Sequence, residues 1–125
     1  MNNYLFIFFG SGFGGICRYF ISNSIAVFAH KNFPYGTLTV NVTGSFLMGF
    51  LFVILLEKLN FFSVELRAFL LIGFLGGYTT FSSFSIETLN LFEQGKWLLA
   101  FSNVGAHLFL CIAASLLGVM LGRLI

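Results

Sequence analysis

The chain has 125 residues, of which 58% are hydrophobic and only 8% are charged, and its formal net charge is +2. Soluble domains carry about 25% charged residues, so this composition predicts an integral membrane protein. A charge this small gives no support for nucleic-acid binding. An enzyme is the least expected class, because the sequence offers no nucleophile–base pair and no catalytic metal motif.

Four apolar segments are long enough to cross a bilayer, which takes about 20 helical residues. They run over residues 4–28, 37–56, 66–92 and 97–124. The connections between them are short. The sequence therefore predicts an all-α membrane protein with one four-helix domain over residues 1–125 and no extramembrane domain.

Basic residues give almost no orientation signal. One side of the predicted membrane holds Lys58, Arg67 and Arg123, and the other holds Lys31 and Lys96. Orientation follows the Lys/Arg excess of short loops. Two interpretations stay open: a chain that inserts both ways and pairs as an antiparallel dimer, or a weakly biased chain with one orientation.

Small residues spaced four apart occur in every segment. The pairs are Gly10 with Gly14, Ser45 with Gly49, Gly73 with Gly77, and Gly118 with Gly122. Such pairs let helix backbones approach closely in a membrane. Their number in one short chain favours oligomerisation.

The third segment contains the most unusual stretch, GFLGGYTTFSSFS at residues 73–85. Polar, flexible backbone at membrane depth is tolerated only where protein buries it or where it lines a watery cavity. We therefore expect this helix to break in mid-membrane, at the place where the protein acts. Broken helices offer N-termini to anions and unwound carbonyls to cations.

Phe81 and Phe84 follow the expected break and lie three apart on one helix face. The edge of a phenyl ring is positive, so two ring edges can contact a small anion. Plain packing is the competing interpretation in a chain with 19 phenylalanines. The hydroxyls of Ser82, Ser83 and Ser85 favour a wet or buried polar surface instead.

Polar stripes at four-residue spacing mark two other segments. They comprise Thr37, Asn41 and Ser45 in the second segment, and Asn103, His107, Cys111 and Ser115 in the fourth. Residues four apart share a helix face. The Asn41 amide can donate to an anion or bond a neighbouring helix, and the residues alone leave both open. Two such stripes together favour a polar pathway.

Arg18 is the one strong charge well inside a predicted span. Placing it there costs at least about 2.5–3.5 kcal/mol on insertion scales, which favours a functional role. It would attract anions at a vestibule or lock a dimer interface. The alternative is a side chain that reaches the lipid headgroups.

Three segments together resemble the Fluc (CrcB) fluoride channels: GGICRY (14–19), GTLTVNVTGSFLMG (36–49) and GFLGGYTTFSSFSIE (73–87). The resemblance covers essentially the whole chain. It implies passive fluoride export through two pores of a dual-topology, antiparallel homodimer in the bacterial inner membrane. It assigns the fluoride path to Arg18, Asn41, Phe81, Phe84, His107, Cys111 and Ser115.

The resemblance also implies a structural sodium ion at the dimer centre, held by backbone carbonyls of Gly76 and Thr79. The chain departs from the family pattern at two positions. Cys111 stands where many relatives have serine, and a thiol is the weaker hydrogen-bond donor. Tyr78 replaces a frequent leucine, and we expect little effect because only neighbouring backbone would bind sodium.

The main alternative function is a small proton-coupled multidrug exporter of dual topology. Proton coupling needs a titratable group at depth. None of the four glutamates lies in mid-span, although Glu87 comes closest, and His107 is a second group that can titrate. A non-transporting assembly subunit is a further alternative, but it would leave the polar stripes unexplained.

Overall fold

The computed structural model describes residues 2–59 and 63–125, and every regular element within them is helical. Four stretches are long and apolar enough to cross a membrane: Asn3–Phe28, Tyr35–Lys58, Val64–Glu93 and Trp97–Leu124. Their ends lie within two residues of the predicted ones. The predicted multi-pass, all-helical membrane architecture is confirmed at this level.

The first, second and fourth stretches are nearly regular helices. They are α1 (Asn2–Phe28), α2 (Tyr35–Phe52), which runs on into the π-helical turn η1 (Val53–Lys58), and α6 (Trp97–Leu124). The third is composite, with α3 (Val64–Arg67), the π-helical segment η2 (Ala68–Phe74), α4 (Leu75–Tyr78) and α5 (Phe81–Glu93).

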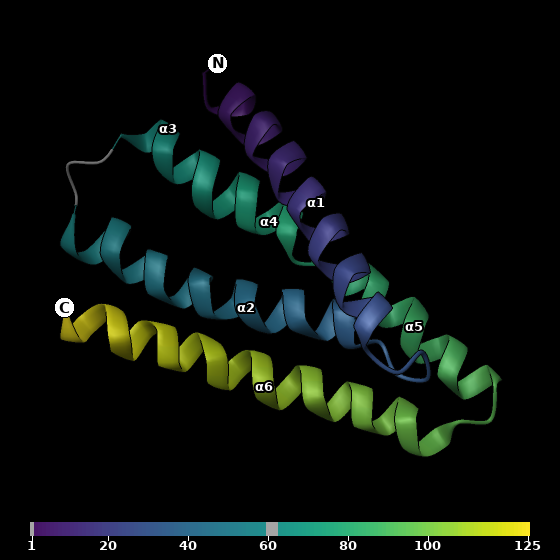
Figure 1. Cartoon of the computed structure of the whole chain (residues 1–125). Helices are drawn as coiled ribbons and strands as arrows, with labels where there is room; N and C mark the ends of the chain where they lie inside the picture. Colours follow the sequence, from purple (N-terminus) through teal and green to yellow (C-terminus); the bar gives the residue numbers. More distant parts are fainter. Residues whose placement is uncertain (1, 60–62) are drawn as a thin grey trace.

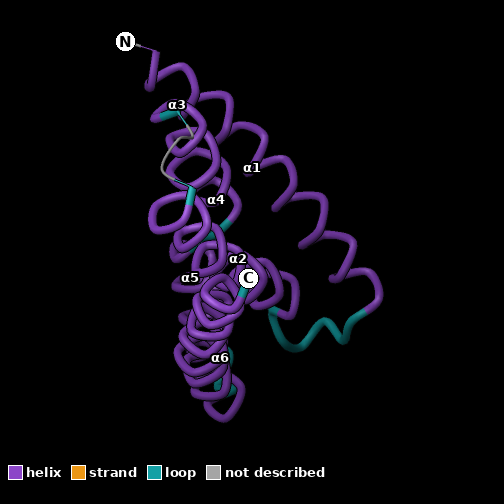
Figure 2. The backbone as a smooth tube through the Cα atoms, turned by 90° about the vertical axis from the view of Figure 1, so that its left-hand side faces the viewer, coloured by secondary structure: helices purple, strands orange, loops and turns teal. Residues whose placement is uncertain are grey.

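Two helix pairs organise the molecule. The helices α2 and α6 lie side by side along most of their length, and α1 packs against η2 and α4 (Figure 1). Figure 2 shows α1 diverging from the other helices towards its C-terminal end, where a loop leads back to α2. At the opposite end of α2, the Arg123 guanidinium lies 3.3 Å from the Glu57 carboxylate and ties α6 to η1.

The interior is small and the outer surface is apolar. A compact cluster of Leu55, Leu71 and Leu75 joins η1, η2 and α4. Large apolar side chains point outwards instead, such as Phe28 and Leu98, which are 91% and 80% exposed. Such a surface is favourable only in lipid or against another apolar protein surface.

Glycines hold the helices of this one chain together. A Cβ atom on Gly49 would overlap the carbonyl oxygen of Ser115 on α6, and one on Gly118 would overlap that of Phe46 on α2. A Cβ atom on Gly10 would overlap the backbone of η2 in the same way. The small-residue pairs therefore serve packing within the chain, and by themselves they do not indicate oligomerisation.

The third stretch is interrupted at two threonines, where the sequence predicts a break. Thr79 and Thr80 have extended backbone, with φ/ψ of −84°/156° and −152°/117°. The helix ends at Tyr78 and starts again at Phe81. The Thr80 hydroxyl accepts a hydrogen bond from the Ser83 amide at 3.2 Å and so caps α5. A cap of this kind stabilises the restart of the helix.

Candidate functional site

One groove gathers every predicted path residue except Arg18. It has a volume of about 570 Å³ and lies between α2, the Thr79–Thr80 break, α5 and α6. The predicted residues in its wall are Asn41, Phe81, Phe84, His107, Cys111 and Ser115. Side chains that are far apart in sequence thus share one polar and aromatic surface.

Asn41 clamps the break to α2. Its Nδ2 donates to the Thr80 carbonyl oxygen at 2.9 Å, and the Thr80 amide donates to its Oδ1 at 2.8 Å. The Asn41 side chain is buried, so these bonds are shielded from water. A carboxamide carries two N–H groups, and this clamp engages one of them. Asn41 therefore makes the interhelical contact that the sequence left open, and it keeps one donor for another acceptor.

The clamp changes the bonding of the helix that precedes the break. In a continuous helix the Thr80 amide would donate to the carbonyl of Gly76, four residues earlier. Here that amide donates to Asn41 instead. Gly76 is exposed, and a Cβ placed on it would meet no atom of residues 2–59 and 63–125 within 4 Å. The Gly76 carbonyl thus loses its usual helical partner, and a backbone carbonyl oxygen is a suitable ligand for a hard cation.

Tyr78 adds a second link between the break and α2. Its hydroxyl lies 2.9 Å from the Thr43 Oγ1, and its ring stacks on Phe74 with centroids 5.9 Å apart. Tyr78 is 5% exposed. The tyrosine at this position is therefore a packed residue whose hydroxyl adds a contact with α2.

The two predicted pore phenylalanines form an aromatic corner of the groove. Their ring centroids are 5.2 Å apart with planes inclined at 52°, and the Phe84 ring lies 4.4 Å from the His107 ring. Phe81 is 79% exposed, so packing within this chain does not account for it. Phe84, by contrast, packs against α6.

The polar stripe of α6 faces both α5 and α2. Asn103 is completely buried, and its Nδ2 donates to the Thr88 hydroxyl at 2.9 Å. His107 Nδ1 lies 3.0 Å from the Asn103 carbonyl oxygen. Ser115 Oγ donates to the Ser45 carbonyl oxygen at 3.1 Å. Asn103 thus links two helices, whereas the next three residues of the stripe line the groove.

Arg18 lies in a different hollow, of about 600 Å³, on the side where α1 diverges from α2 and α5. Thr37, Thr80 and Glu87 also line this hollow. Thr80 is the residue that borders both it and the groove. The sequence assigned Arg18 to a vestibule or a dimer interface, and within one chain it lies apart from the six residues of the groove.

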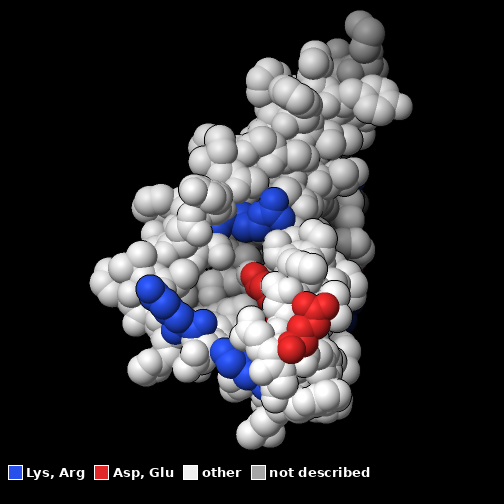
Figure 3. All heavy atoms as spheres, turned by 90° about the vertical axis from the view of Figure 1, so that its right-hand side faces the viewer, with Lys and Arg blue, Asp and Glu red and all other residues white. Residues whose placement is uncertain are grey.

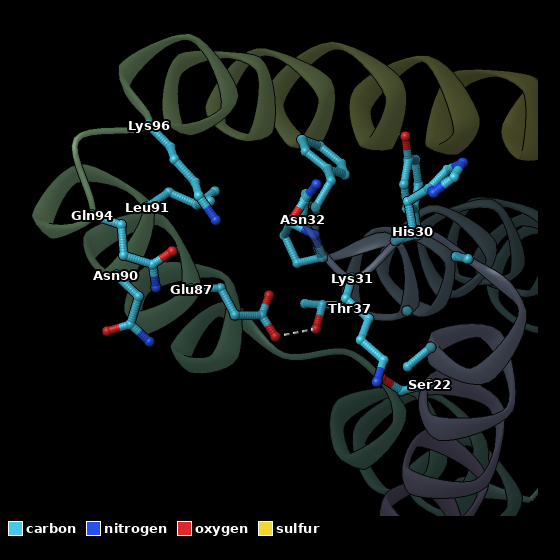
Figure 4. A pocket seen from close by; sticks show the side chains of 16 residues that line it. Ser22, His30, Lys31, Asn32, Thr37, Glu87, Asn90, Leu91, Gln94 and Lys96 are labelled. Atoms are coloured by element: carbon cyan, nitrogen blue, oxygen red, sulfur yellow. Dashed lines mark hydrogen bonds between the residues drawn. The ribbon is translucent and has the colours of Figure 1, made fainter.

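A third pocket, of about 410 Å³, opens beside that hollow and shares Thr37 and Glu87 with it. The Thr37 hydroxyl donates to Glu87 Oε1 at 2.6 Å, and Lys31 and Lys96 come from the neighbouring loops (Figure 4). Figure 3 shows basic and acidic side chains gathered around this hollowed face. Sequence reasoning did not foresee the Thr37–Glu87 pair, although Thr37 lies on the Asn41 face of its helix.

Apolar side chains complete the groove, and they too were missed. They are Met48 on α2 and Val104, Leu108 and Ile112 on α6. Each lies on the same helix face as the polar residues of its own helix. Met48 follows Asn41 by two turns, and the other three flank His107 and Cys111. The available signal was therefore helical register rather than residue type.

The chain is similar to channel proteins over almost its full length. A family model described as "CrcB-like protein, Camphor Resistance (CrcB)" matches residues 5–119. A protein of Coxiella burnetii strain CbuK_Q154 is 55% identical over 97% of this chain and 98% of its own, and its name is "Fluoride-specific ion channel FluC". Proteins of the same name from Magnetococcus marinus and Shewanella loihica are 44% and 45% identical, over 93% and 97% of this chain and 94% and 96% of their own. This chain therefore belongs to the CrcB family.

Proposed function

We propose that this protein is a fluoride-specific channel of the bacterial inner membrane that lets fluoride leave the cell passively. Its relatives carry the name of such a channel, and their names describe ion channels rather than enzymes. The observation that carries the proposal is the groove, where six residues assigned to the path by sequence lie together.

The groove offers a small anion different partners along its length. At the break, the spare N–H of Asn41 can donate to the anion. Beside it, the inclined rings of Phe81 and Phe84 present positive edges to an ion that has lost water. Along α6, the Cys111 thiol and Ser115 hydroxyl add donors, the thiol being the weaker. Replacement of water by such fixed groups is the physical basis of ion selectivity in a pore.

A second copy of the chain would complete the path. In one chain Phe81 is 79% exposed, so the groove is not enclosed on that side. The near-balanced basic residues on the two sides are compatible with copies in opposite orientations. We infer an antiparallel homodimer with the break of the third stretch at mid-membrane, where each copy closes a groove of the other.

We propose that backbone carbonyls at the break hold a structural sodium ion. Gly76 has a carbonyl without its helical partner, and Thr79 has extended backbone next to it. These two oxygens would hold the ion, which would supply positive charge between the two broken helices. Replacement of sodium by a large organic cation should lower the thermal stability of the dimer in detergent, and unchanged stability would contradict a bound sodium ion.

Fluoride release from liposomes tests the function. Purified protein is reconstituted, a potassium ionophore clamps the voltage, and a fluoride electrode follows release, with chloride release measured in parallel. We expect fast fluoride release and no chloride release above protein-free liposomes. A folded protein that releases no fluoride would contradict the proposal. Proton-driven uptake of cationic drugs would then identify the exporter.

A further inference from the structure

His107 has one ring nitrogen bonded and the other without a partner. Its Nδ1 lies 3.0 Å from the backbone carbonyl oxygen of Asn103, one helical turn earlier. Its Nε2 is buried and has no hydrogen-bond partner among residues 2–59 and 63–125. The residue is 8% exposed and lines the groove. These surroundings determine which of the two ring nitrogens carries the proton.

The contact with Asn103 determines the tautomer of the neutral ring. A carbonyl oxygen only accepts hydrogen bonds, so Nδ1 of His107 must carry the proton. Neutral imidazole has a single N–H, and Nε2 is then an acceptor with a free lone pair. A lone pair repels an anion in the groove. Only the doubly protonated ring presents an N–H donor and a positive charge at Nε2.

Packing keeps the ring in this orientation. The Phe84 ring lies 4.4 Å from the His107 ring, centroid to centroid. The fully buried Asn103 side chain donates to Thr88 and so holds α6 against α5 at this level. A 180° flip of the ring would put Cδ2 in the place of Nδ1 and so break the bond to the Asn103 carbonyl. Nε2 is therefore the ring nitrogen that is left without a hydrogen-bond partner, on a residue that lines the groove.

We propose that His107 makes fluoride passage depend on proton binding: the neutral ring opposes the anion through its Nε2 lone pair, and the cationic ring donates to it. This inference rests on the proposed function of the groove. Histidine is the side chain that ordinarily changes charge between pH 5 and 8. Fluoride release should accordingly increase as the solution is acidified.

Other titratable groups around His107 are neutral at such pH or face elsewhere. On α6, Cys111 also lines the groove, and a thiol is ordinarily neutral at these pH values. On α5, the Glu87 carboxylate accepts from Thr37 and lines the other two pockets. On α4, the Tyr78 hydroxyl is engaged with α2. The described groove residues of α2 include no titratable side chain.

A comparison of two histidine variants tests the inference. Fluoride release is measured at about pH 7.5 and 5.5, and the HF leak of protein-free liposomes is subtracted. Wild-type release should rise on the order of tenfold on acidification. The reason is that a hydrogen bond from the charged imidazolium is stronger than one from a neutral group. His107→Gln, which cannot become charged, should respond little. His30→Gln should respond like wild type, because His30 is exposed and lines a different pocket.

A second measurement does not depend on transport. Nitrogen NMR of isotope-labelled histidine in the His30→Gln protein reports the tautomer of His107 alone. The expected result at neutral pH is a proton on Nδ1. A proton on Nε2, or a wild-type pH response equal to that of His107→Gln, would overturn the inference. Absence of wild-type fluoride release at both pH values would contradict the proposed function, whereas release that is equal at both would contradict this inference alone.

Discussion

The two bonds between Asn41 and the Thr80 backbone hold the break in its observed form. Asn41→Ala removes both and leaves a buried N–H and C=O unpaired. We expect a loss of stability of about 2–3 kcal/mol and loss of fluoride release. Thermal unfolding in detergent and release from liposomes measure the two effects. Thr39→Ala is the control, because the Thr39 hydroxyl donates to the Tyr35 carbonyl oxygen of its own helix. If Asn41→Ala were as stable as the wild-type protein, the proposed role of these two bonds would be contradicted.

The phenylalanine edges allow a second test at the residue scale. Phe81→Ile and Phe84→Ile keep an apolar side chain but remove the positive ring edge, so fluoride release should be abolished. The oligomeric state, measured by size-exclusion chromatography with light scattering, should not change. Phe109→Ile is the control, since Phe109 is 72% exposed on α6 and does not line the groove. Wild-type release in both groove variants would exclude the ring-edge mechanism.

At the scale of elements, the close packing of α2 on α6 depends on glycine. Gly49→Ala would force its methyl group into the Ser115 carbonyl, and we expect a loss of about 1–3 kcal/mol, the usual cost of overpacking. Gly105→Ala on α6 should be tolerated, because its Cβ would meet no atom of the described residues within 4 Å. Unfolding midpoints of the two variants give the comparison. Equal midpoints would show that α2 and α6 are not packed this closely.

Local sequence signals predicted the elements well, because hydrophobic length and breaker residues act locally. The four spans and the interruption at Thr79–Thr80 follow from such signals. The partner of Asn41 lies 39 residues away, and no local pattern specifies it. The same limit explains Arg18, whose separation from the groove depends on how α1 diverges from the other helices. The partner of Asn41 and the position of Arg18 therefore depend on tertiary packing, which local sequence patterns do not specify.

At the scale of the whole molecule, function is proposed to require two copies in opposite orientations. Lys31→Gln with Lys96→Gln removes the basic residues of one side and leaves three on the other. This bias should fix a single orientation and abolish fluoride release. Coexpression with a variant of opposite bias should restore it. Topology reporters on the C-terminus measure orientation, and full release from a chain of one orientation would contradict the antiparallel dimer.

Current through a planar bilayer tests the central claim most directly, because it separates passive fluoride conduction from every coupled alternative. With a tenfold fluoride gradient and equal chloride and pH on both sides, the current should reverse about 59 mV from zero, as expected for one monovalent ion. A chloride or proton gradient should leave that reversal potential unchanged. A reversal potential that follows the proton or chloride gradient would contradict a fluoride-specific channel.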